Sequence, residues 1–140
     1  MPLVIYFSRG GKTRKIAEVI AEELGCTAID AEEGTPDISG TDILVVGSGN
    51  YGGAPHKDFQ DFLEGLPPGD GSRAAVFATS GGKEPKCIGI MEDGLETRGY
   101  STVSSFDCRG QFLLLSRGHP DENDLENARA FARDLRTGAV

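Results

Sequence analysis

The chain has 140 residues, of which 38% are hydrophobic and 26% charged, and a net charge of −8. This length and composition predict one globular domain over residues 1–140. The acidic balance argues against a nucleic-acid binder, and no apolar stretch approaches the roughly 18 residues of a membrane span. The three cysteines form no CxxC or zinc pattern, which is typical of a reducing cytoplasm, so we expect a cytoplasmic protein.

Strand and helix patterns alternate along the whole chain. In chain order, the predicted elements are a strand over 3–7, a helix over 13–24 ended by Gly25, a strand over 26–30, a strand over 43–46, a loop over 47–55, a helix over 56–65, a strand over 74–78, a helix over 86–98, a strand over 101–106 and a helix over 121–135. This alternation predicts an open, mostly parallel sheet covered by helices on both faces. Ligands of such sheets bind at the carboxyl ends of the strands.

The loop after the first predicted strand is the most informative segment. Residues 8–13 read Ser-Arg-Gly-Gly-Lys-Thr and lead directly into a helix. A strand that feeds a helix in this way directs backbone N–H groups and the positive helix end at one spot, which favours an anion. Residues 8–15 carry four basic side chains and no acidic one, which leaves −12 for the rest of the chain. The sequence therefore predicts a phosphate site on this loop.

Other phosphate-binding and catalytic motifs do not fit. Gly11-Lys12-Thr13 looks like the end of a Walker A loop, but Tyr6 stands where that motif needs glycine. The glycine spacing also differs from the dinucleotide-binding GxGxxG pattern. No Ser/His/Asp arrangement for nucleophilic catalysis stands out, so we expect no catalytic residue and no metal ligand.

Two more glycine-rich loops follow the third and fourth predicted strands. Because the ends of parallel strands meet at one edge, we expect these loops to converge with the first. The candidate cofactor-binding residues of the three loops are Ser8, Arg9, Gly10, Gly11, Lys12, Thr13, Ser48, Gly49, Asn50, Tyr51, Gly52, Gly53, Thr79, Ser80, Gly81 and Gly82. Outside the loops, His56 is interpreted as an N-terminal residue of its helix and Cys87 as a buried thiol.

With these loops in this order, the chain resembles a short-chain flavodoxin along essentially its whole length. The first loop is similar to the family's TxTGxT phosphate motif, with Ser8, Gly11 and Thr13 at matching positions. Gly10 departs from the motif because it replaces the middle hydroxyl. Arg9 and Lys12 offer positive charge there instead.

The resemblance implies a three-layer α/β fold, whose five-stranded parallel sheet has the order 2-1-3-4-5, and FMN as cofactor. It also implies that Tyr51 stacks on the flavin and that the Gly52 peptide responds to its redox state. The third loop departs from the family, because no aromatic residue lies between Phe77 and Tyr100 to cover the outer flavin face.

Three functions stay open at this point. The first is a low-potential electron carrier that works as a monomer with basic redox partner proteins, a reductase or an oxidoreductase, and with neither nucleic acid nor membrane. The second is an FMN-dependent NAD(P)H:acceptor reductase, for example of quinones or flavins. The third is an interaction domain that has lost the flavin, against which the basic first loop argues. We expect the electron carrier.

Overall fold

The computed structural model describes residues 1–7, 11–33, 38, 40–49, 55–80, 86–109 and 122–138. Its elements are β1 (Pro2–Phe7), α1 (Gly11–Leu24), β2 (Ala28–Asp30), the 3-10 turn η1 (Ala31–Glu33), β3 (Ile43–Gly49), α2 (Phe59–Glu64), β4 (Arg73–Ser80), α3 (Cys87–Thr97), β5 (Ser101–Arg109) and α4 (Glu122–Thr137). The five strands form one parallel sheet in the order β2-β1-β3-β4-β5, as the resemblance implied.

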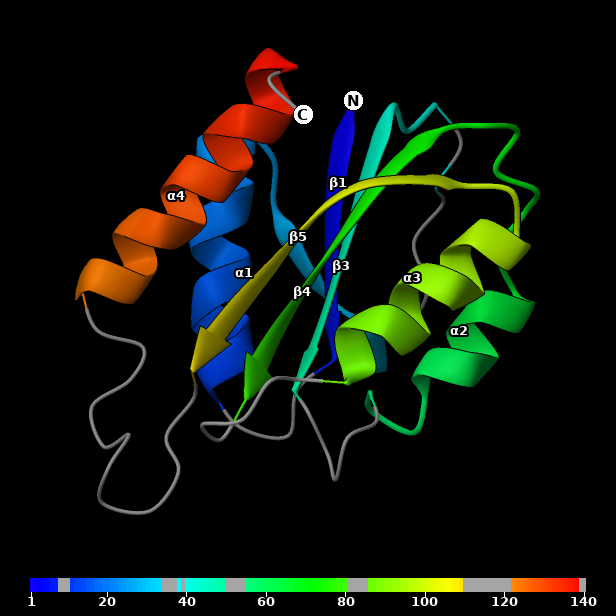
Figure 1. The fold of residues 1–140 in the computed structure, drawn as a ribbon, viewed down its shortest axis with the longest axis horizontal. Helices are drawn as coiled ribbons and strands as arrows, with labels where there is room; N and C mark the ends of the chain where they lie inside the picture. Colours follow the sequence, from blue (N-terminus) through cyan, green and yellow to red (C-terminus); the bar gives the residue numbers. More distant parts are fainter. Residues whose placement is uncertain are drawn as a thin grey trace.

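The sheet is covered on both faces, α1 and α4 lying on one and α2 and α3 on the other (Figure 1). Successive strand residues point to opposite faces, which gives each strand two buried sides. In β1, Val4 and Tyr6 pack with α1 and α4, whereas Ile5 and Phe7 pack with α2 and α3. The nearly continuous apolar runs of the central strands are therefore explained by two cores, one on each face.

The end of α1 confirms the sequence interpretation of Gly25. This glycine has a φ of 78°, in the left-handed region that side chains disfavour. Its N–H donates to the Glu22 carbonyl at 3.2 Å, and the Cys26 N–H donates to the Ala21 carbonyl at 2.9 Å. This pair of bonds is the Schellman motif, which ends the helix and turns the chain toward β2.

The strands differ from the prediction mainly in length. β3 continues through Gly49, and β4 through Ser80, so the second and third loops begin later than expected. Gly47 belongs to β3, opposite Phe77 of β4, and not to a loop. A Cβ built on Gly47 would lie 1.9 Å from Cζ of Phe77. This glycine therefore leaves space for an aromatic ring. The sequence predicts a loop residue here, because Gly47 stands at the start of a glycine-rich segment.

Among the described segments, no helix is long and apolar enough to cross a membrane.

Gly47→Ala should lower the free energy of unfolding by about 1–3 kcal/mol, because the Phe77 ring must move to admit the methyl group. Gly89→Ala in α3 is the matched control, since a Cβ there meets nothing within 4 Å. That control should be neutral or stabilising by up to about 1 kcal/mol, because alanine favours a helix interior over glycine. Urea denaturation of both variants measures the difference. Equal stability of the two variants would contradict the packing role of Gly47.

Candidate functional site

Three strands that precede the predicted loops end side by side at one edge of the sheet. Phe7 of β1 is in register with Ser48 of β3, which is in register with Ala78 of β4. The next pair, Gly49 and Thr79, is also in register. The chain runs from β1 outward to β2 and then returns to β3 on the other side of β1, so the topological switch point lies between β1 and β3. Ligands of open α/β sheets bind outside this point.

The N-terminus of α1 lies at this edge and carries positive charge. The helix begins at Gly11, two residues earlier than predicted, and its first turn contains Lys12 and Thr13 and no acidic residue. Lys12 is half-buried, whereas Arg14 and Lys15 are exposed. Arg14 Nε lies 3.5 Å from Glu18 Oε2 one turn further on. The first N–H groups of a helix have no acceptor within it, and together with the nearby cations they favour an anion at this helix end.

A buried hydrogen bond joins the first turn of α1 to the end of β4. Thr13 Oγ1 and Thr79 Oγ1 lie 2.8 Å apart, and the two residues are 3% and 8% exposed. One hydroxyl donates to the other, so the pair keeps one hydroxyl hydrogen for a further acceptor. The sequence placed these residues in separate loops, 66 positions apart, and the structure brings them into direct contact.

Ser48 ends up inside the protein at the end of β3. Its Oγ donates to the Gly49 carbonyl at 2.8 Å and accepts the His56 N–H at 2.8 Å. The second bond holds the backbone of His56 beside the end of β3. The assignment of Ser48 and Gly49 to cofactor binding stays a prediction.

Nine of the predicted site residues lie outside the described residues: Ser8, Arg9, Gly10, Asn50, Tyr51, Gly52, Gly53, Gly81 and Gly82. Ser80 is described as the last residue of β4, without its side chain. The described residues of the candidate site are thus those of the strand ends and of the first turn of α1.

His56 is the residue that sequence reasoning misplaced. It lies three residues before α2 and is 3% exposed, so it is not a helix N-terminal residue. Its ring packs 6.0 Å from that of Phe7, centroid to centroid. It lines a cleft of about 620 Å³ together with Ala31, Glu32, Lys57, Asp58, Asp61 and Phe62. Nothing local in the sequence indicates this cleft, because η1 and the start of α2 meet there from distant positions.

Cys87, the first residue of α3, is a buried thiol as expected. Burial, and next the negative charge of Asp107, raise its pKa from 9.0 to about 11. Burial also raises the pKa of the Cys26 thiol. Because the thiolate is the reactive form, the position of Cys87 at a helix N-terminus does not make it a nucleophile.

Iodoacetamide at pH 8 should therefore leave Cys87 unmodified in the folded protein and alkylate it in urea. The raised pKa and the lack of solvent contact act in the same direction. Peptide mass spectrometry, with half-buried Cys26 as the internal comparison, measures the modification. Rapid native alkylation of Cys87 would contradict its inert environment.

Comparison with known proteins gives a consistent result. The family model described as "Flavodoxin domain" matches residues 3–110. An uncharacterized protein of Methanocaldococcus jannaschii is 32% identical over 145 residues, which cover 95% of this chain and 96% of that protein. A flavodoxin from the domain Archaea superposes with a TM-score of 0.80 at 14% identity, over 99% of this chain and 98% of that one. A short-chain flavodoxin associated with a non-canonical PDU bacterial microcompartment gives 0.77 at 21% identity, over 100% and 99%.

Proposed function

The chain belongs to the flavodoxin family, and we propose that it binds FMN at the carboxyl edge of its sheet and carries electrons between partner proteins. The observation that carries this proposal is the buried Thr13–Thr79 pair at the positive end of α1, beside the topological switch point. Flavin supplies the redox chemistry when bound, and the protein supplies binding, orientation and electrostatics.

The first loop and the first turn of α1 are proposed to hold the phosphate. Thr13 sits in this turn, and its contact with Thr79 fixes where its hydroxyl lies. The first N–H groups of a helix have no acceptor within the helix itself, and this turn contains no carboxylate that would repel an anion. Ser8, Arg9 and Gly10 precede it directly in the sequence and would complete the cradle. These features fit a phosphate monoester.

The second and third loops are proposed to hold the flavin ring. They begin at the ends of β3 and β4, which are in register with each other. β3 also pairs with β1, the strand from which the phosphate loop leaves. Tyr51 would stack on one face of the ring, because an aromatic side chain packs well on a flat heterocycle. Gly52 would let the following peptide reorient at low steric cost. Thr79 to Gly82 would border the ring from the β4 side.

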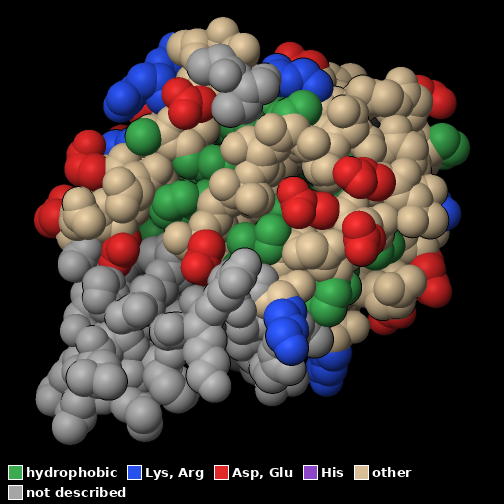
Figure 2. Space-filling model, in the orientation of Figure 1, with side chains coloured by type: hydrophobic (Ala, Val, Ile, Leu, Met, Phe, Trp, Pro, Cys, Tyr) green, Lys and Arg blue, Asp and Glu red, His purple; other side chains and the backbone are tan. Residues whose placement is uncertain are grey.

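Electron transfer with protein partners is favoured over turnover of NAD(P)H by the charge of the chain. Outside residues 8–15 the net charge is −12, which repels a second phosphorylated ligand and attracts a basic protein surface. Figure 2 shows acidic side chains spread over one face of the molecule without gathering in a single patch. The net charge therefore attracts basic proteins in general, and the choice of one partner depends on individual side-chain contacts at the interface.

The alternative, an FMN-dependent NAD(P)H:acceptor reductase, is favoured by one sequence feature. The segment between Phe77 and Tyr100 has no aromatic residue that could cover the outer flavin face, so a nicotinamide could approach it. The two functions make opposite predictions for direct reduction by a nicotinamide.

Thr13→Val should weaken FMN binding by about 1.5–3 kcal/mol, roughly tenfold to over a hundredfold, because a hydroxyl donor to a charged acceptor is lost. Riboflavin, which lacks the phosphate, should bind the variant as it binds the wild type. Fluorescence titration with both flavins gives the ratio of affinities.

Thr97→Val is the matched control for this experiment. The Thr97 hydroxyl donates to the Asp93 carbonyl on the exposed face of α3, so both affinities should be unchanged. The double variant Thr13→Val/Thr79→Val removes both buried hydroxyls and separates lost phosphate contact from an unsatisfied Thr79. If Thr13→Val changes neither affinity, the phosphate lies elsewhere.

Anaerobic mixing of the FMN-loaded protein with excess NADH or NADPH should give slow or no bleaching of the flavin absorbance. Adding a flavodoxin reductase should start reduction, at a rate that falls with salt because the attraction between the partners is screened. Stopped-flow absorbance measures both rates. Reduction at turnover rates without a partner would contradict the carrier function and support the reductase.

A further inference from the structure

A buried imidazole lies between two carboxylates on the α2 side of the sheet edge. His56 Nε2 is 3.9 Å from Glu32 Oε1, and His56 Nδ1 is 3.6 Å from Asp58 Oδ2. The His56 side chain is 2% exposed, whereas those of Glu32 and Asp58 are about half exposed. The three residues come from η1, from the segment that follows β3 and from the residue before α2. They therefore join two parts of the chain at one point.

The spacing of these groups suits ligands that share a metal ion. One donor atom from each of the three residues lies within 4.8 Å of the other two. Two donors at about 2.0–2.1 Å from a tetrahedral ion are roughly 3.4 Å apart. The two separations given above start from different ring nitrogens, and one ion takes only one of them. With either nitrogen as the ligand, a carboxylate oxygen within 4.8 Å must therefore come closer, which rotation of the half-exposed Glu32 and Asp58 side chains allows. An ion could thus be bound without moving the buried ring.

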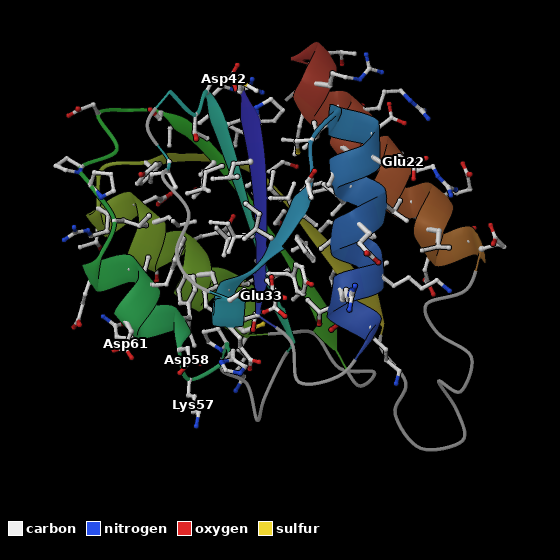
Figure 3. The ribbon with its side chains drawn as sticks, turned by 180° about the vertical axis from the view of Figure 1, so that it is seen from behind. Glu22, Glu33, Asp42, Lys57, Asp58 and Asp61 are labelled. Carbon is white, nitrogen blue, oxygen red and sulfur yellow. The ribbon has the colours of Figure 1, made fainter. Side chains whose placement is uncertain are left out.

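The surroundings favour a cation that keeps part of its water shell. The three donors line the cleft of about 620 Å³, which gives room for water ligands. Asp61 adds a third carboxylate to the lining, and among the lining residues that the structure describes Lys57 is the one cation. Figure 3 shows Lys57, Asp58 and Asp61 near the end of the molecule at which η1, with Glu33, also lies. The Phe7 ring packs against the imidazole, and Phe62 adds a second aromatic side chain to the lining of the cleft.

We propose that Glu32, His56 and Asp58 form a binding site for a first-row divalent cation, with Zn²⁺ as the best-fitting ion. An imidazole with two carboxylates is a nitrogen and oxygen donor set that suits Zn²⁺, whereas Mg²⁺ and Ca²⁺ prefer oxygen alone. The neutral ring gives one nitrogen to the ion and keeps its single proton on the other. The Asp58 N–H donates to His56 Nδ1 at 3.1 Å and must adjust in either case, because Nδ1 then either binds the ion or carries the ring proton.

The site is distinct from the proposed phosphate site, and its test does not depend on FMN binding. Its ligands lie on the α2 side of the sheet, whereas Thr13 and α1 lie on the other side. A bound ion would clamp η1 to the segment before α2. Because the His56 N–H also donates to Ser48 Oγ at the end of β3, the clamp would extend to the strand end from which the second loop leaves.

The test is a calorimetric titration of the purified full-length chain with ZnCl₂. One Zn²⁺ should bind per chain, and an equal concentration of Mg²⁺ or Ca²⁺ should not displace it. Glu32→Gln and Asp58→Asn should each weaken Zn²⁺ binding by about tenfold or more, since even the outer partners of metal ligands are worth that much. Asp61→Asn is the matched control, because it removes a carboxylate of the same cleft from outside the donor set; it should change the affinity less than about threefold.

Two spectroscopic readouts place the ion. The chain has two histidines, so ¹H–¹⁵N spectra of the imidazoles, assigned with His119→Gln, should show a Zn²⁺-induced shift at His56. Co²⁺ should give d–d bands without a thiolate charge-transfer band, which excludes the cysteines as ligands.

The proposal is overturned if no Zn²⁺ binds, if Asp61→Asn weakens binding as much as Asp58→Asn, if Mg²⁺ or Ca²⁺ competes equally, or if the His56 signals do not move. Binding of FMN enters none of these measurements.

Discussion

The ring of Phe77 lies across Gly47 at the centre of the sheet, and this contact allows β3 and β4 to pack in their register. From that register it follows that Gly49 and Thr79 are level, and that Phe7, Ser48 and Ala78 form a row across three strands. Thr79 is thereby placed within hydrogen-bonding distance of Thr13 in the first turn of α1. A packing requirement inside the core thus determines where the loops of the candidate site begin.

The same edge of the sheet carries two different chemistries because its two faces are covered by different helices. On the α1 side, the described first turn has a half-buried lysine, the positive end of the helix dipole and no acidic residue. On the α2 side, Glu32, Asp58 and Asp61 surround a cleft that ends on the buried His56. An anion is favoured on the first side and a cation on the second, and the strands of the sheet lie between them. One strand edge can therefore host a phosphate and a metal ion without placing them in contact.

Sequence reasoning was most successful where the determinants are local. Gly25 ends α1 through bonds to residues three to five positions away, and the apolar period of each element is visible in its own residues. The alternation of elements, with the three glycine-rich loops, then led to the correct fold and family. It was less successful where the determinants are tertiary. Gly47 looked like part of a loop because the ring that requires it comes from another strand.

The misplacement of His56 has the same cause. The apolar pattern of Phe59, Phe62 and Leu63 predicts a helix from residue 56, but the helix begins only at Phe59, and the imidazole packs against Phe7. Its neighbour Glu32 is 24 positions away, so no spacing motif links them. The sequence likewise does not predict the hydrogen bond between Thr13 and Thr79, although it identifies each of the two residues as a candidate site residue. Contacts between loops depend on the strand register, which one sequence does not display.

The central claim, that FMN binds at the carboxyl edge of the sheet, is tested most directly by the visible absorption spectrum of the chain after incubation with FMN and gel filtration. The account predicts that flavin bands coelute with the protein at one FMN per chain, and that riboflavin is retained far less well because it lacks the phosphate. Elution of the protein without flavin bands at any FMN concentration, or equal retention of FMN and riboflavin, would contradict it.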